Sequence, residues 1–129
     1  MIVVDASALL EVLLNTRSAS VVSRRLFAAG ETLHAPHLLD LEVTQVLRRY
    51  AAAGALTEDR GNQALEDLAD LPVDRYPHHL FLDRIWQLRH NLTAYDAAYI
   101  VLAEALGAPL VTRDAALAKA KHRARVEVL

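Results

Sequence analysis

Four acidic residues, spread along the whole chain, stand where a carboxylate could take part in chemistry. Asp5 and Asp114 come at or just after the ends of short apolar runs, whereas Glu42 and Asp96 lie within longer helical patterns. Carboxylate oxygens are the ligands that hard divalent cations prefer. Four carboxylates crowded together repel one another, and a cation relieves that repulsion. If folding gathers these residues, we expect a Mg²⁺ or Mn²⁺ site.

Each of the four acids also has an ordinary structural explanation. Asp5 and Asp114 each precede a helical pattern, and aspartate is a preferred helix N-cap. Thr93-x-x-Asp96 resembles a capping box. Glu42 lies at the edge of an apolar stripe, where a glutamate can simply extend into solvent. The combination of four acids is therefore more informative than any one of them.

Other kinds of catalytic site are poorly supported. The chain has no cysteine, which excludes disulfides, zinc–thiolate sites and cysteine nucleophiles. Of the six histidines, His78 and His79 are adjacent and cannot form a metal-binding pair one helical turn apart. No phosphate-binding glycine loop and no G-x-S-x-G motif is present. We interpret the histidines as structural or surface residues.

Short apolar segments alternate with helical patterns along the chain. Strands are expected at 2–4, 32–35, 71–76, 109–112 and 126–129. Helices are expected at 6–14, 18–29, 37–53, 57–69, 78–90, 93–106 and 114–121. This alternation predicts an α/β fold of parallel strands joined by helical crossovers. In such sheets, binding sites lie beyond the carboxyl ends of the strands, near a switch point in strand order.

The apolar spacing also predicts core residues. Helix 37–53 has an apolar stripe of Leu39, Val43, Val46, Leu47 and Tyr50. In helix 78–90 the core candidates are Leu80, Ile85, Trp86 and Leu88. We interpret Tyr50, Trp86 and Tyr99 as core or interface residues rather than substrate contacts.

The bulk composition is that of a small globular protein. A length of 129 residues fits one domain, residues 1–129. The net charge is −2, but without the four acids the basic residues outnumber the acidic ones, so local contact with a nucleic acid is possible. Candidate phosphate contacts are Arg48-Arg49, Arg113 and the basic segment 119–125, although a solvated helix face is the favoured interpretation of each group; Arg113, next to Asp114, is the best candidate. We expect no leader, no membrane segment and a cytoplasmic setting.

The four acids lie within motifs that are similar to those of a known family. The motifs are Ile2-Val3-Val4-Asp5-Ala6-Ser7-Ala8-Leu9, Pro36-x-x-Leu39-x-x-Glu42-Val43, Tyr95-Asp96-Ala97-Ala98-Tyr99 and Leu110-Val111-Thr112-Arg113-Asp114-x-x-Leu117. In this order and spacing, the chain resembles PIN-domain proteins, and specifically the VapC-type toxins of bacterial toxin–antitoxin pairs. The resemblance covers essentially the whole chain.

The resemblance implies a three-layer α/β/α fold with a central, mostly parallel sheet of four to five short strands. It implies a Mg²⁺- or Mn²⁺-dependent endoribonuclease that is inhibited by a small antitoxin and forms a homodimer. The implied catalytic residues are Asp5, Glu42, Asp96 and Asp114, of which Asp5, Asp96 and Asp114 would hold the metal. Ser7, Thr112 and Arg113 would support the site. Some relatives carry an acidic or polar residue where Ala116 stands, so a second metal would be held less tightly here.

Three alternatives remain open. The chain could be a PIN-type nuclease that processes RNA rather than a toxin. It could be a PIN-like module that binds a partner without catalysis, although the four intact acids argue against this. It could be a phosphate-accepting α/β receiver, but that fold needs an acidic cluster at the first strand, where Asp5 stands alone.

Overall fold

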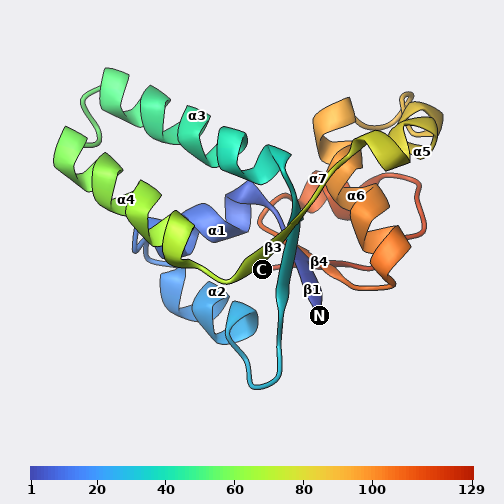
Figure 1. Cartoon of the computed structure of the whole chain (residues 1–129), viewed down its shortest axis with the longest axis horizontal. Coiled ribbons are helices and arrows are strands. Elements are labelled where there is room, and N and C mark those ends of the chain that lie inside the picture. Colours follow the sequence, from blue (N-terminus) through green and yellow to red (C-terminus); the bar gives the residue numbers. More distant parts are fainter.

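Five short strands form one parallel sheet at the centre of the molecule (Figure 1). The computed structural model describes all 129 residues. The strands are β1 (Ile2–Val4), β2 (Leu33–Pro36), β3 (Val73–Tyr76), β4 (Leu110–Thr112) and β5 (Val126–Val128). Their order is β3-β2-β1-β4-β5, and every neighbouring pair is parallel. The prediction of a mostly parallel sheet of four to five strands is confirmed, and the sheet is in fact entirely parallel.

Helices cover both faces of the sheet. They are α1 (Ala6–Leu13), α2 (Ala19–Leu26), α3 (Leu38–Ala52), α4 (Glu58–Asp70), the 3₁₀ helix η1 (His79–Phe81), α5 (Leu82–Gln87), α6 (Ala94–Leu106) and α7 (Ala115–Lys119). Figure 1 shows α1 to α4 on one side of the sheet and α5 to α7 on the other. This confirms the three-layer α/β/α arrangement. No helix combines the length and the apolar character needed to cross a bilayer.

The two most buried elements are β1 and α6. All three residues of β1 are β-branched and fully buried, as expected for a strand covered on both faces. In α6 every residue from Ala97 to Ala103 is buried, because this alanine-rich helix lies directly against the sheet and α5. The Thr93 hydroxyl caps the start of α6, and Gly107 ends it in the left-handed conformation, with φ of 62°. These two elements anchor the site described below.

The strand order contains one switch point. The chain runs from β1 to β2 to β3 toward one edge of the sheet, and then returns so that β4 pairs with the other side of β1. Val3 is in register with Leu110 and Val4 with Val111. The residues that follow β1 and β4 therefore leave the sheet at the same edge, side by side. This is the location where parallel α/β sheets bind their ligands.

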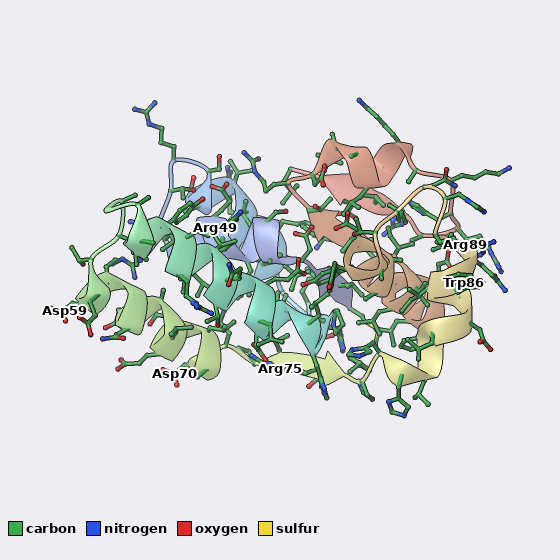
Figure 2. All side chains as sticks on the ribbon, turned by 90° about the horizontal axis from the view of Figure 1, so that it is seen from above. Arg49, Asp59, Asp70, Arg75, Trp86 and Arg89 are labelled. Carbon is green, nitrogen blue, oxygen red and sulfur yellow. The ribbon has the colours of Figure 1, made fainter.

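The segment 78–90 differs from the sequence-based expectation. It forms the short elements η1 and α5 rather than one helix, and α5 packs one face against α6. Ile85 and Leu88 are buried as predicted, but Leu80 is 71% exposed and Trp86 is 66% exposed, so those two core assignments are wrong. Figure 2 shows Trp86 beside Arg89 on the outer side of α5, and the Arg89 guanidinium carbon lies 4.4 Å from the Trp86 ring centroid.

The apolar stripe of α3 is mostly confirmed. Leu39, Val43 and Leu47 are buried, and Val46 is half-buried. Tyr50 is 43% exposed and is therefore outside the core, so only the interface half of its interpretation stays open. It lines a surface groove between α1 and α3.

Candidate active site

Asp5 and Asp114 lie at the switch point between β1 and β4. Asp5 directly follows β1, and its backbone N–H donates to the carbonyl of Val111, 3.3 Å away. Asp114 follows β4 after one intervening residue and caps α7, its carboxylate accepting from the backbone N–H of Ala116 at 2.9 Å. Both predicted N-cap assignments therefore hold, and both carboxylates also stand at the ligand-binding edge of the sheet.

The Asp5 carboxylate is held by three donors. One oxygen accepts from the Ser7 hydroxyl at 2.7 Å and from the Ala8 N–H at 3.1 Å, and the other accepts from the Thr112 hydroxyl. Asp5 is only 6% exposed. Burial raises the pKa of Asp5, and the hydrogen bonds from Thr112, Ser7 and Ala8 oppose that rise by favouring the ionised form. The hydrogen bonds thus hold the carboxylate in place, although burial makes its negative charge unfavourable.

The hydroxyls of Ser7 and Thr112 join the ends of the two strands. Ser7 accepts from the Arg113 N–H and Thr112 accepts from the Asp114 N–H, both at 2.9 Å. The two hydroxyl oxygens lie 3.2 Å apart, but each hydroxyl donates its single proton to Asp5. Each hydroxyl therefore bridges Asp5 and the turn after β4. The structure thus brings two of the three expected supporting residues into contact with Asp5.

Glu42 and Asp96 approach the same region from α3 and α6. Glu42 lies in the second turn of α3 and Asp96 in the first turn of α6, and both are half-buried. The Asp96 N–H donates to the Thr93 hydroxyl at 3.1 Å. The second bond of a capping box, from the Thr93 backbone N–H to the Asp96 carboxylate, is not made. Neither the Glu42 nor the Asp96 carboxylate forms a hydrogen bond of normal geometry or an ion pair within the chain.

The four carboxylates act on one another electrostatically. Burial is the main factor that raises the pKa values of Glu42 and Asp96, as it does for Asp5. Asp114 raises the pKa values of Asp5 and Asp96 further, and the charges of Asp96 and Asp5 raise that of Glu42. No lysine or arginine forms an ion pair with any of the four. Folding has therefore gathered negative charge without a protein cation to balance it.

This donor set fits a hard divalent cation. It contains only carboxylate and hydroxyl oxygens, which suit Mg²⁺ or Mn²⁺ rather than zinc. As the side chains stand, no three acidic or histidine residues are close enough together to hold one ion. That spacing is compatible with Mg²⁺, which commonly uses one or two carboxylates and completes its shell with water and substrate phosphate. Histidines contribute nothing: His34 bonds to Tyr76 and Thr32, and His122 to the Leu117 carbonyl.

Arg113 is not directed at the acids. Its guanidinium donates to the Leu129 carbonyl and to the Ser18 hydroxyl, and it lies 3.7 Å from a carboxylate oxygen of Glu11. These contacts tie the turn after β4 to α1 and to the start of α2. Only the backbone N–H of Arg113 touches the site, through Ser7.

A groove of about 530 Å³ runs between α1 and α3 beside the acids. Its lining includes Ser7, Glu42 and Arg113 from the site. The remainder comes mostly from one face of each helix: Ala6, Leu10, Glu11, Leu14, Gln45, Val46, Arg49 and Tyr50, with Thr16 from the following turn. Figure 2 shows Arg49 on α3. The groove thus combines an apolar floor with charged side chains and opens beside Glu42.

Sequence reasoning missed one side chain at the site. Tyr99 is buried in α6, as predicted for a core residue, but its hydroxyl has no hydrogen-bond partner and lies near Glu42. The available signal was its spacing. Tyr99 comes three residues after Asp96 and so shares its helical face.

Fold and site together define a parallel α/β protein with an acidic cluster at the switch point of its sheet. The chain matches the PIN domain family model over residues 2–123. It is 51% identical over 114 residues to Ribonuclease VapC9 of Mycobacterium tuberculosis, covering 88% of this chain and 86% of that protein. It is 41% identical over 130 residues to Ribonuclease VapC12 of the same species, covering 100% and 99%. The chain belongs to the PIN domain family.

Two solved structures share this fold. The crystal structure of PAE2754 from Pyrobaculum aerophilum is 29% identical, with a TM-score of 0.71 over 96% of this chain and 81% of that one. The structure of Mycobacterium tuberculosis VapC20, described as a Sarcin-Ricin loop cleaving toxin, is 16% identical, with a TM-score of 0.70 over 92% and 94%. At that identity the VapC20 likeness concerns the fold alone.

Proposed function

We propose that this chain is a metal-dependent endoribonuclease and the toxin of a toxin–antitoxin pair, with residues 1–129 acting as a single PIN domain. The observation that carries the proposal is the set of four carboxylates at and beside the switch point, none of which is paired with a lysine or arginine. Asp5 is buried, Glu42 and Asp96 are half-buried, and Asp114 is exposed. The proposal's support also comes from relatives that are named ribonucleases and are similar over nearly the whole chain. Action on RNA fits a cytoplasmic setting.

The site residues have distinct proposed roles. Asp5, Asp96 and Asp114 would hold Mg²⁺ or Mn²⁺, one or two of them directly and the rest through water, and Glu42 would complete the shell or orient the attacking water. Ser7 and Thr112 keep Asp5 in place through the hydrogen bonds described above. When bound, the ion lowers the pKa of a water molecule and stabilises negative charge on the phosphate. Arg113 organises the turn that carries Asp114, and its remaining N–H groups can meet an RNA phosphate.

The groove between α1 and α3 is the proposed antitoxin site. Leu10, Leu14 and Val46 provide apolar contacts along two helices, which suits an amphipathic helix laid in a groove. Glu42 lies in the same lining, so a basic side chain of the bound segment can reach the acids. An antitoxin in this position would exclude RNA from the site.

The exposed apolar side chains of η1 and α5 are the proposed homodimer surface. Leu80, Leu82 and Trp86 are 71%, 55% and 66% exposed, although large apolar groups are usually buried. Contiguous exposed apolar patches commonly mark interaction sites. A second copy of the chain would cover these side chains and leave the groove between α1 and α3 open.

Replacing Asp96 is the sharpest test of nuclease activity. Because the Asp96 carboxylate is outside the hydrogen-bond network that holds Asp5, Asp96→Asn removes a proposed ligand and leaves that network in place, unlike Asp5→Asn. We expect purified wild-type protein to cleave RNA with Mn²⁺ and not with a chelator, and Asp96→Asn to be at least about 100-fold slower. The matched control is Asp59→Asn, at the outer end of α4 in Figure 2, which should cleave normally.

Retained cleavage by Asp96→Asn at the wild-type rate would contradict this assignment. Expression in a bacterial host then separates the roles. A toxin arrests growth, and co-expression of a small protein encoded beside it relieves the arrest. RNA cleavage without growth arrest favours a processing nuclease. The absence of both cleavage and metal binding favours a partner-binding module.

A further inference from the structure

Two buried polar atoms, one on α3 and one on α6, lack a partner. Tyr99, in the second turn of α6, is only 2% exposed, and its hydroxyl makes no hydrogen bond. On α3, the Oε1 atom of Glu42 is equally buried and equally unpartnered. Most buried polar groups in folded proteins are hydrogen-bonded, so such atoms call for an explanation.

The Tyr99 phenol and the Glu42 carboxylate lie close enough to interact with each other. Burial raises the pKa of the Tyr99 phenol, and the adjacent Glu42 carboxylate raises it further, whereas the phenol lowers the pKa of Glu42. No hydrogen bond of normal geometry joins them directly. A small rotation of either side chain, or one bridging water, would satisfy both atoms at once.

The chemistry of the pair sets the direction of such a bond. A phenol is protonated near neutral pH, so the Tyr99 hydroxyl can donate, and an ionised carboxylate can only accept. No other side chain competes for either atom, since both are unpartnered within the chain. The Tyr99 ring is locked by the surrounding core, whereas Glu42 lies half-buried at the groove.

We propose that Tyr99 is a positioning residue, whose hydroxyl holds the Glu42 carboxylate in the orientation that serves the acidic site. The assignment of Glu42 to that site rests on the proposed function. Without the hydroxyl, Glu42 is free to rotate toward the groove and solvent. Tyr99 itself touches neither metal nor RNA.

Tyr99→Phe is the direct test, because it removes the hydroxyl and keeps the packed ring. Tyr76→Phe is the matched control: it removes a phenol hydroxyl that bonds to His34 at 2.7 Å, on β3 and away from the acids. We expect Tyr99→Phe to lower kcat about tenfold with little change in KM, and to weaken Mn²⁺ binding several-fold by calorimetry without RNA. Tyr76→Phe should change neither.

A double-substitution cycle links the effect to Glu42. In a Glu42→Gln background, Tyr99→Phe should have a much smaller effect on Mn²⁺ affinity and on kcat, because the two groups act together. Equal effects in both backgrounds would mean that Tyr99 acts only through packing, and would overturn the proposal.

A measurement on metal-free protein separates this inference from the proposed function. With ¹³C-labelled glutamate, the side-chain carboxyl resonance of Glu42 should move on Tyr99→Phe and stay in place on Tyr76→Phe. An unmoved resonance overturns the positioning role whether or not the protein cleaves RNA. A moved resonance in a protein without nuclease activity supports the contact and refutes only the nuclease.

Discussion

Thr112→Val tests whether the Asp5 carboxylate depends on its hydroxyl neighbours. Thr112 is fully buried in β4, donates to Asp5 and accepts from the Asp114 N–H. Valine has nearly the same shape and favours strands, so the substitution removes the hydroxyl with little change in packing. It leaves one oxygen of Asp5 without its donor and the Asp114 N–H without its acceptor.

The expected loss follows from these two bonds. A hydrogen bond to a charged group contributes about 1.5–3 kcal/mol, and one between neutral groups about 0.5–1.5 kcal/mol. The Asp114 N–H is only partly buried, so water can replace part of its bond. We expect Thr112→Val to lower the free energy of unfolding by about 2–4 kcal/mol at pH 7.5, or roughly 10 °C in Tm.

Urea unfolding of metal-free protein measures this loss, and Thr112→Ser is the matched control. Serine keeps the hydroxyl and loses the methyl group, so it should be less destabilising than valine. The Thr112→Val loss should also be smaller at pH 4, because a protonated Asp5 depends less on a donor. A serine variant that is as unstable as the valine variant, or a loss independent of pH, would refute the reasoning.

Three further predictions concern metal, dimer and antitoxin. The pKa values of Asp5, Glu42 and Asp96 are raised in the folded chain above the ordinary values of 3.8 for aspartate and 4.5 for glutamate. The folded state therefore binds more protons than the unfolded state, so these three groups make the metal-free protein less stable as pH rises above about 4. Mn²⁺ must displace those protons, so calorimetry should find a larger Mn²⁺-induced rise in Tm at pH 7.5 than at pH 5, and an equal rise would count against the acidic site. Leu82→Glu should convert a dimer to monomer in sedimentation analysis, whereas Leu65→Glu on α4 should not; a dimer that survives Leu82→Glu uses another surface. Val46→Arg should fill the groove between α1 and α3, so that the variant stays toxic when the antitoxin is co-expressed; full neutralisation would place the antitoxin elsewhere.

Most of the fold could be predicted from local patterns. The β-branched run 2–4 and the alanine-rich helix after Thr93 formed as expected, because strand and helix periodicities are set by residues a few positions apart. The pattern failed at Leu80 and Trp86. Their spacing suits a helix with a buried face, but η1 and α5 pack mainly against α6, and Leu80 and Trp86 remain exposed.

The sequence predicted which residues form the site, but not which of their atoms contact one another. The four acids stand out by type and by position relative to strands and helices. That Thr112 donates to Asp5, and that the Arg113 N–H donates to Ser7, depends on the pairing of β1 with β4, which no local pattern contains. Likewise, Arg113 is next to Asp114 in sequence, but only the structure shows that its guanidinium contacts Leu129 and Ser18 rather than the four acids.

The sequence by itself determined most of the strands and helices, the positions where Asp5 and Asp114 cap helices, and that the chain has oxygen ligands and no thiols. Only the tertiary structure decided which of these residues meet. The order β3-β2-β1-β4-β5 brings together residues about 110 positions apart at one edge of the sheet, and the packing of α6 against the sheet places Tyr99 opposite Glu42. Such contacts depend on the path of the crossovers and on the shared core, which are properties of the whole chain rather than of any segment.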